Sequence, residues 1–382
     1  MPTGSDTSLK IVGLECEALE GASWGTGRIV LNLIRSLAKI PGIEERYRFV
    51  CYSNNPLAEG IIPDHPAFVA CPVGLKTLHP SLPSSFSVYY YLLLPLHMWR
   101  TRPSLVYFAN YMLPVFHPPR VTSLVMLTDD IFREANNPHL PIRFRLAYKV
   151  FATGWAKRRA TAIHAISYAS ASTLEKLGVE RSRIVVNPLG IPAPREGIEP
   201  ENSSFLFVGQ AFERRRLRES LRCFERLATG DTSLTFRIIG VDKYRVPTIG
   251  ALVDAVNARL GRRAVVWSTY ESDAVLASAY AGARALMYVS DSEAFGLPPL
   301  EALSYGVPPV VADIPVMHEI YGDNAFYVAP PYGENEIERS MRDVLNDSEH
   351  GARIRSDGPS VAARYTWDSH AGRFLDAVAH MI

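Results

Sequence analysis

Cysteine is scarce in this sequence and irregularly placed. The 382 residues contain four, Cys16, Cys51, Cys71 and Cys223, without CxxC spacing and without a histidine pattern beside them. Structural zinc sites and redox-active thiol pairs use closely spaced cysteines, so neither is predicted. We interpret the four as buried thiols of a protein in a reducing compartment.

Long hydrophobic runs are also missing. The most apolar stretch, residues 88–99, is about twelve residues long and contains a proline and a histidine, whereas a membrane-spanning helix needs about 20 residues. It predicts a buried helix, with a helix at a membrane interface as the alternative. Residues 1–9 are polar and lack the apolar core of a signal peptide, so we expect a cytoplasmic protein.

An excess of charge of one sign is the third absence. Lys and Arg number 40 and Asp and Glu 39, a formal net charge of +1. Overall electrostatics therefore give no reason to expect nucleic acid as a partner. The hydrophobic share of 47% is ordinary for a soluble protein, and the length exceeds what one core usually supports, so two domains are expected.

Short apolar runs alternate with helical patterns in both halves of the chain. This alternation is typical of an α/β fold with parallel, doubly wound sheets. Ligands of such folds bind beyond the carboxyl ends of the strands, so two such domains would face a cleft. In the first half we predict strands at 10–14, 48–52, 105–108, 123–127 and 162–166 and a helix at 29–40. In the second half we predict strands at 205–208, 235–239, 264–267, 285–289 and 309–312, and helices at 217–228, 248–260, 274–281 and near residue 299.

The most informative segment reads EAFGLPPLE at residues 293–301. Pro299 suits the first turn of a helix, and Gly296 lets the backbone approach a ligand closely. The amides of Phe295, Gly296 and Leu297 and the positive helix end then form a site for an anion such as a diphosphate. In this arrangement Glu301 can accept hydrogen bonds from ribose hydroxyls, and Glu293 can orient a sugar. Compensation of the helix dipole is the alternative for Glu301 alone.

A run of arginines precedes the predicted helix at 217–228. Cations at the amino end of a helix oppose its dipole, so a bound anion explains the run better than a solvated basic surface does. The run therefore predicts a site for an anion, with Arg214 and Arg215 as candidate ligands.

These motifs resemble glycosyltransferase family 4, the retaining enzymes of GT-B architecture. Residues 293–301 resemble its E-x(7)-E signature, and residues 24–28, WGTGR, resemble its amino-terminal glycine-rich loop. Gly209 followed by RRRL at residues 214–217 stands where the family has a glycine turn and then R-K-N-L. The lysine of that pattern is Arg215 here, which keeps the charge and adds bidentate phosphate binding.

The resemblance implies a domain plan and an activity. The plan is an acceptor domain at 1–190, a linker at 191–204, a nucleotide-sugar donor domain at 205–363 and a terminal helix at 364–382 that packs back on the first domain. The activity is transfer of a hexose from a nucleoside-diphosphate sugar, with GDP-mannose as first choice, to a glycan or lipid-linked acceptor in surface polysaccharide or glycoconjugate synthesis. Retention of configuration is expected, and no metal or other cofactor.

The implied site draws on both domains. Its predicted catalytic residues are Arg214, Arg215, Glu293 and Asp129. Its predicted donor-binding residues are Gly25, Thr26, Gly27, Gly209, Phe295, Gly296, Leu297 and Glu301.

Asp129 departs from the family pattern, which has a histidine at this position. A carboxylate there repels a diphosphate unless it is neutralised or turned aside. The aspartate therefore leaves open an inactive partner subunit that binds sugar nucleotide. A nucleotide-sugar epimerase of the same fold is a separate alternative. A phosphorylase is disfavoured because the second domain offers only Lys243 for pyridoxal phosphate.

Residues 142–159 combine six basic residues with aromatic and aliphatic ones. This pattern predicts peripheral contact with anionic lipid at the inner face of a membrane, or with a lipid-linked acceptor. A solvated charged helix face is the alternative.

Overall fold

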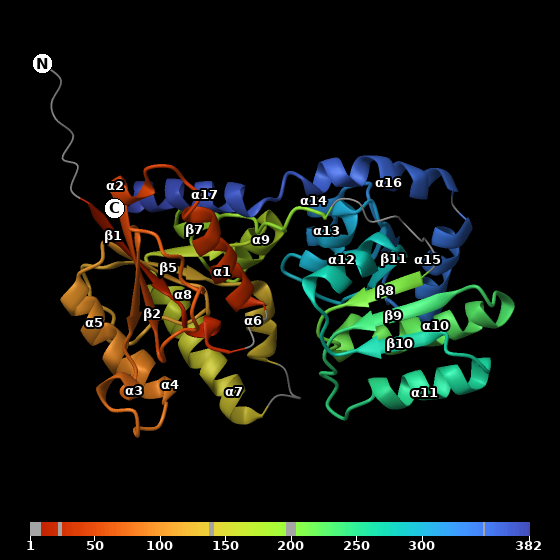
Figure 1. Ribbon diagram of the computed structural model, residues 1–382, viewed down its shortest axis with the longest axis horizontal. Helices are drawn as coiled ribbons and strands as arrows, with labels where there is room; N and C mark the ends of the chain where they lie inside the picture. The colour runs from red at the N-terminus through yellow and green to blue at the C-terminus, as the bar shows by residue number, and fades with distance from the viewer. Residues whose placement is uncertain (1–8, 22–24, 137–140, 196–203, 347) are drawn as a thin grey trace, which may run out of the picture. The chain divides into compact units, whose positions relative to one another are not determined.

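The computed structural model describes residues 9–21, 25–136, 141–195, 204–346 and 348–382. The chain divides into two compact units, Met1–Leu189 with Trp367–Ile382, and Gly190–Thr366. Each unit contains one parallel sheet with helices around it (Figure 1). Of the predicted linker, residues 196–203 lie outside the described part. Ile191 pairs with Thr366 within the second unit.

The first unit has a seven-stranded parallel sheet in the order β3-β2-β1-β4-β5-β6-β7. The five predicted strands are present within one residue at each end. β3 and β7 were not predicted. β3 contains a proline and is half-buried, and β7 has only three residues. The strands are β1 Lys10–Glu15, β2 Tyr47–Ser53, β3 Phe68–Pro72, β4 Leu105–Phe108, β5 Thr122–Met126, β6 Ala162–Ala165 and β7 Ile184–Val186.

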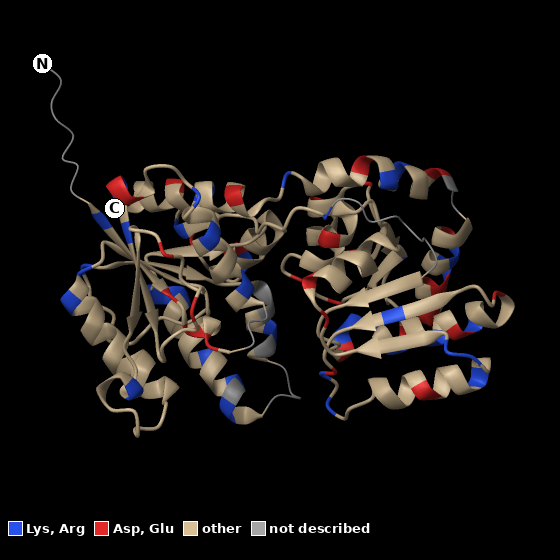
Figure 2. Ribbon diagram, in the orientation of Figure 1, with Lys and Arg blue, Asp and Glu red and all other residues tan. Residues whose placement is uncertain are grey.

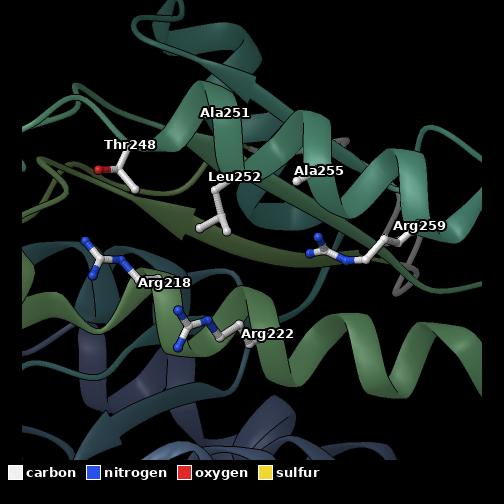
Figure 3. Close-up of a pocket in the computed structure, with 7 residues that line it drawn as sticks. All are labelled: Arg218, Arg222, Thr248, Ala251, Leu252, Ala255 and Arg259. Carbon is white, nitrogen blue, oxygen red and sulfur yellow. The ribbon is translucent and has the colours of Figure 1, made fainter.

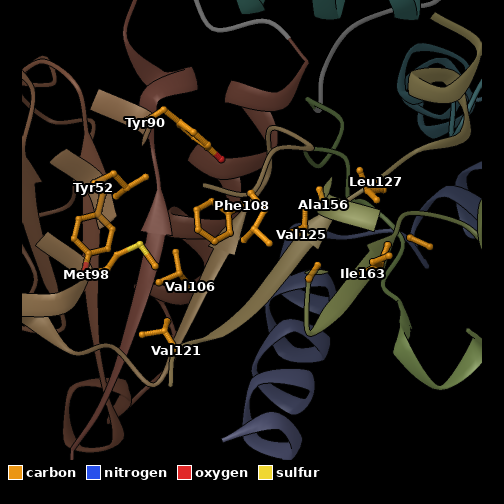
Figure 4. Close-up of a cluster of buried hydrophobic side chains, with 14 of the residues drawn as sticks. Tyr52, Tyr90, Met98, Val106, Phe108, Val121, Val125, Leu127, Ala156 and Ile163 are labelled. Atoms are coloured by element: carbon orange, nitrogen blue, oxygen red, sulfur yellow. The ribbon is translucent and has the colours of Figure 1, made fainter. Parts of the chain in front are cut away.

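Helices connect these strands and cover the sheet. Their apolar sides and the sheet together form a core of valine, isoleucine, tyrosine and phenylalanine side chains, part of which Figure 4 shows. The α-helices are α1 Thr26–Leu37, α2 Ile43–Arg46, α3 Leu75–Leu78, α4 Phe86–Val88, α5 Leu94–Thr101, α6 Asp129–Glu134, α7 Ile142–Ala147, α8 Lys157–Arg159 and α9 Tyr168–Lys176. Two π-helical segments, η2 Tyr89–Leu93 and η3 Tyr148–Ala156, continue α4 into α5 and α7 into α8.

The terminal helix α17, Trp367–Met381, belongs to the first unit and packs against α1. The Asn187 amide donates to the carbonyl oxygen of His370 at 3.0 Å, and the His370 ring donates to that of Pro188 at 2.9 Å. Nearby His164 bridges Tyr107 and the carbonyl of Asn187, and burial lowers the pKa of His164 to about 4. These contacts attach α17 to the sheet through the end of β7.

The second unit has a six-stranded parallel sheet in the order β10-β9-β8-β11-β12-β13. In Figure 1, α10 and α11 lie on one side of it and α12 and α13 on the other. The strands are β8 Ser204–Val208, β9 Thr235–Ile239, β10 Val265–Ser268, β11 Ala283–Tyr288, β12 Pro309–Ala312 and β13 Phe326–Val328. The α-helices are α10 Leu217–Gly230, α11 Ile249–Leu260, α12 Asp273–Ala281, α13 Leu297–Ser304, α14 Pro315–Tyr321, α15 Glu334–Asn346 and α16 Ser348–Ala362. Two doubly wound parallel sheets confirm the predicted fold class.

Gly209 and Gly240 follow the neighbouring strands β8 and β9, and their backbones touch. Gly209 donates its amide hydrogen to the carbonyl of Ile239 at 2.9 Å, and Gly240 donates to that of Ser268 at 2.8 Å. A Cβ atom on Gly240 would overlap the carbonyl oxygen of Gly209. The close approach of the two turns therefore requires glycine at 240, and Gly209 has a φ of +125°, which favours glycine there.

We predict that Gly240→Ala lowers the free energy of unfolding by about 1–3 kcal/mol, because the turn after β8 must move to admit the methyl group. The matched control is Gly230→Ala at the end of α10, where a Cβ meets nothing within 4 Å and alanine is the better helix former. Urea unfolding of both variants measures the difference. Equal midpoints would show that the turn relaxes freely.

Candidate functional site

The second sheet changes winding direction between β8 and β11. These strands are hydrogen-bonded neighbours, but the chain continues from β8 toward β9 on one side and from β11 toward β12 on the other. The connections that leave their carboxyl ends therefore diverge, and a crevice forms at such a switch point. The connection after β8 contains Gly209 and the arginine run, and the connection after β11 contains Glu293.

Glu293 lies between two of the predicted arginines. Its Oε1 accepts hydrogen bonds from Nη1 of Arg214 at 2.7 Å and from Nε of Arg215 at 3.2 Å, and its side chain is only 10% exposed. Burial alone would raise the pKa of Glu293, but the charges of Arg215 and Arg214 outweigh it and hold that pKa below its usual value. The carboxylate is therefore ionised at neutral pH, and three predicted catalytic residues lie together.

The two arginines make different contacts. Nη1 of Arg214 also donates to Oγ of Ser290 at 3.1 Å and to the carbonyl of Ser292 at 2.9 Å, so this side chain holds the connection after β11 in shape. Arg215 donates to the carbonyl of Gln210 at 2.9 Å, and its guanidinium lies over the Tyr288 ring at 4.8 Å. Arg214 thus shapes the connection after β11, and both guanidinium groups lie beside Glu293 as candidates for contact with a ligand.

Gly296 immediately precedes α13 with a φ of +95°, a backbone conformation that favours glycine. Its carbonyl accepts a hydrogen bond from the Tyr321 hydroxyl at 2.6 Å, which fixes the turn. Pro298 and Pro299 have no amide hydrogen, so the start of α13 offers the amides of Gly296 and Leu297 but not the two that follow. The predicted anion site is therefore limited to the backbone amides of the turn that precedes α13.

Glu301 is the fifth residue of α13, whereas a helix that began near residue 299, as predicted, would have placed it in the first turn. Compensation of the helix dipole is correspondingly weak there. The side chain is 5% exposed and accepts a hydrogen bond from the Tyr280 hydroxyl at 2.7 Å. The Tyr280 ring stacks on that of Tyr305 with centroids 5.9 Å apart, and Phe295 packs against Tyr365. The hydrogen bond from Tyr280 thus orients the Glu301 carboxylate.

The remaining predicted residues belong to the first unit. Gly25, with a φ of +57°, precedes α1, Thr26 is the first residue of that helix, and Gly27 is buried. Asp129 is the first residue of α6, after β5, and its side chain lies outside the described atoms. Trp24 also lies outside the described residues.

Glu15 is a buried acid that sequence reasoning missed, at the carboxyl end of β1. It accepts hydrogen bonds from the Tyr89 hydroxyl and the Asn110 amide, both at 2.9 Å, and from the backbone amide of Glu17 at 3.0 Å. Burial raises the pKa of Glu15 to about 8, against the opposing effect of the hydrogen bonds from Glu17 and Tyr89. The first sheet therefore also has a polar group at the edge where ligands bind.

The structure also shows an ion pair between Arg216 and Asp291 that the sequence analysis did not predict. Nε and Nη2 of Arg216 donate to the two carboxylate oxygens, each at 2.8 Å. Arg216 has a left-handed backbone with φ of +46°, where the family pattern R-K-N-L has asparagine, a residue that tolerates this conformation. The bidentate pair offsets the strain and joins the connections after β8 and β11.

A cavity of about 460 Å³ lies between α10 and α11 (Figure 3). Arg218, Arg222 and Arg259 line it with Thr248 and small apolar residues, and it includes neither Glu293 nor Glu301. In the described part of the chain, no group of three or more His, Cys, Asp or Glu side chains is placed to hold a metal ion.

The parallel sheets and the site at the switch point define a protein of the GT-B class. Residues 193–361 match the sequence model of the family "Glycosyl transferases group 1". This match covers nearly the whole of the second unit.

Three solved structures support the fold. The chain superposes on WaaG, a glycosyltransferase involved in lipopolysaccharide biosynthesis, with a TM-score of 0.69 at 18% identity over 96% of this chain and 99% of the other. Sucrose-phosphate synthase from Thermosynechococcus elongatus gives 0.70 at 15% identity over 97% and 99%. HepE from Anabaena, in complex with UDP and glucose, gives 0.68 at 15% identity over 98% and 100%.

Curated relatives match shorter segments. The serotype-specific mannosyltransferase WbdA of Escherichia coli is 31% identical over 156 residues, which are 40% of this chain and 18% of the relative. The O-antigen chain mannosyltransferase RfbU of Salmonella typhimurium is 37% identical over 90 residues, 24% of each chain. The chain thus spans less than a quarter of the length of these two relatives.

We predict that Arg216 and Asp291 are energetically coupled, since each offsets a cost that the other creates. Asp291→Asn should destabilise the chain when Arg216 is present and much less in an Arg216→Asn background, because asparagine accepts the left-handed backbone. Urea unfolding of the four chains of this double-mutant cycle should give a coupling free energy of about 1 kcal/mol. Strictly additive effects would contradict the proposed compensation.

Proposed function

We propose that this protein is a retaining hexosyltransferase that uses a nucleoside-diphosphate sugar. The observation that carries the proposal is the Glu293 carboxylate clasped by Arg214 and Arg215 at the switch point of a glycosyl transferases group 1 domain. In this proposal the buried acid Glu293 accepts hydrogen bonds from the sugar hydroxyls of the donor. The neighbouring arginines bind its diphosphate. Glu301 is the acid that we propose for the ribose hydroxyls, and its burial and its hydrogen bond from Tyr280 support this role.

The proposed reaction needs no covalent intermediate. The bond between the anomeric carbon and the diphosphate oxygen breaks, and an acceptor hydroxyl oxygen bonds to that carbon from the same face, which retains the configuration. The acceptor proton passes to the departing diphosphate. Arg215 and the turn amides at Gly296 and Leu297 stabilise the charge that develops there. This chemistry requires neither metal nor organic cofactor.

GDP-mannose is the donor that we propose first. The matching curated relatives are named as mannosyltransferases, two of them of O-antigen chains. A growing surface polysaccharide or a lipid-linked glycan is the corresponding acceptor, and nucleic acid is not an expected partner. Among the described helices, none combines the length and apolar character needed to cross a bilayer. We propose a cytoplasmic enzyme with peripheral membrane contact through helices of the first unit.

An inactive subunit that binds sugar nucleotide is the second candidate, and Asp129 in the position of the family histidine favours it. Such a subunit would bind donor without transferring sugar to any acceptor. An epimerase would instead convert nucleotide sugar in the absence of acceptor. Product analysis with and without an acceptor glycan distinguishes these two activities from transfer.

We predict that one nucleotide sugar in a panel of GDP, UDP, dTDP and ADP sugars stabilises the protein selectively, with GDP-mannose expected. A ligand at a hundred times its dissociation constant adds about 2.7 kcal/mol to the free energy of unfolding. Glu301→Ala should weaken donor binding by about 1–3 kcal/mol. The control is Glu349→Ala, an exposed acid on α16. Calorimetric titration measures both, and unchanged affinity in Glu301→Ala would refute the ribose assignment.

We predict that Arg215→Ala lowers kcat by about 100- to 1000-fold with a smaller effect on KM, because its cation acts on charge that develops in the transition state. Arg215→Lys restores the residue of the family pattern and should keep most of the activity. Steady-state kinetics on the donor identified by titration provide the test. A KM effect alone would place Arg215 in ground-state binding.

A further inference from the structure

Positive charge is concentrated in one part of the first unit. Residues 65–174 contain eleven Lys and Arg but only three acidic residues, Asp129, Asp130 and Glu134. The whole chain has a formal net charge of only +1, so the rest of the molecule is acidic. In Figure 2 the ribbons of α5 and α7 carry basic and no acidic positions. Such an asymmetry attracts this region to an anionic surface.

A first stripe of exposed apolar side chains runs along η2 and α5. Leu92, Leu96 and Trp99 are 60%, 43% and 58% exposed. Their spacing places them on one side of the helical stretch, while Tyr89 and Met98 on its other side are fully buried. The helix predicted to be buried is therefore buried on one side only. Its other side is exposed and apolar, as the alternative of an interfacial helix requires.

A second stripe runs along α7 and η3. Ile142, Leu146 and Val150 recur every four residues and are 65%, 53% and 54% exposed. Arg143 and Lys149 are exposed beside them. An apolar stripe flanked by exposed cations is typical of helices that lie in the interface of a bilayer with anionic lipids.

The two helical stretches are neighbours in the fold. The rings of Tyr91 in η2 and Phe151 in η3 have centroids 5.2 Å apart. Isolated exposed apolar residues are normal on a protein surface, but six at helical spacing on two adjoining elements are not. Tryptophan also favours the boundary between lipid and water.

We infer that these two stripes form a lipid-facing surface that docks the first unit on a bilayer containing anionic phospholipid. The lipid-facing surface consists of Leu92, Leu96, Trp99, Ile142, Leu146 and Val150 with the flanking Arg143 and Lys149. The apolar side chains enter the headgroup region, and the cations contact lipid phosphates. The inference rests on the proposed function in one respect: the lipid-facing surface would give the enzyme access to a lipid-linked acceptor.

The lipid-facing surface differs from the membrane region that sequence reasoning predicted. It adds η2 and α5, and it leaves out the basic cluster at the end of 142–159. There, Nζ of Lys157 donates to the carbonyl of Leu177 at 2.5 Å, and the Arg159 guanidinium lies over the Trp155 ring at 5.3 Å. Those two side chains are engaged within the unit.

Sedimentation of the full chain with lipid vesicles tests the inference. Binding should be weak on phosphatidylcholine alone, rise when phosphatidylglycerol is added, and fall with salt. The double variant Trp99→Ser/Leu146→Ser should lose about tenfold or more in vesicle affinity because it removes one anchor from each stripe. The control is Val246→Ser, which removes a still more exposed apolar side chain, 70% exposed, from the second unit.

Other outcomes are equally decisive. Equal vesicle binding by the double variant and the parent chain would overturn the inference. A parent chain that dimerises in analytical ultracentrifugation, with the dimer lost in the double variant, would instead assign the surface to a second copy. Donor binding should be unchanged in the double variant. A chain that binds vesicles but no nucleotide sugar would refute the proposed function and leave the surface intact.

Discussion

A single buried carboxylate organises the second unit of this protein. Glu293 lies where two neighbouring strands send their chains in opposite directions, and it is tolerable there only because two guanidinium groups compensate its charge. The same guanidinium groups come from the connection after β8, so the ion pairs also fix the distance between the two connections. Charge neutralisation and shape are therefore one requirement at this site, and removing either side leaves an uncompensated charge.

The sequence predicted most of the fold because its signals are local. Apolar runs such as 105–108, 235–239 and 309–312 coincide with β4, β9 and β12 to the residue. β7 and β13 have three residues each and form no recognisable run, so they were missed. Pairing order and the assignment of α17 to the first unit depend on long-range contacts, and no local pattern contains them.

The site was predicted as a set of residues and less well as a geometry. The grouping of Glu293 with the arginines could be predicted, because the resemblance identified the two connections that meet at the switch point. Arg214 contacts Ser290 and Ser292, and Arg215 contacts Gln210. No sequence spacing indicates these contacts. The start of α13 at Leu297 also moved Glu301 beyond the first helical turn. The hydrogen bond from Tyr280 to that acid joins residues from separate helices and had no sequence signal.

The left-handed backbone of Arg216 has a consequence for how this chain can change over generations. Arginine is strained at that position, and Asp291 supplies the compensating contact, so the order of substitution matters. From an asparagine at 216, an aspartate can arise first at 291 with little penalty, after which the arginine is accommodated. The reverse order passes through a strained intermediate in which Arg216 keeps only its 3.6 Å ion pair with Glu219. Once both are present, each residue restricts replacement of the other, and the two positions are expected to drift only as a pair.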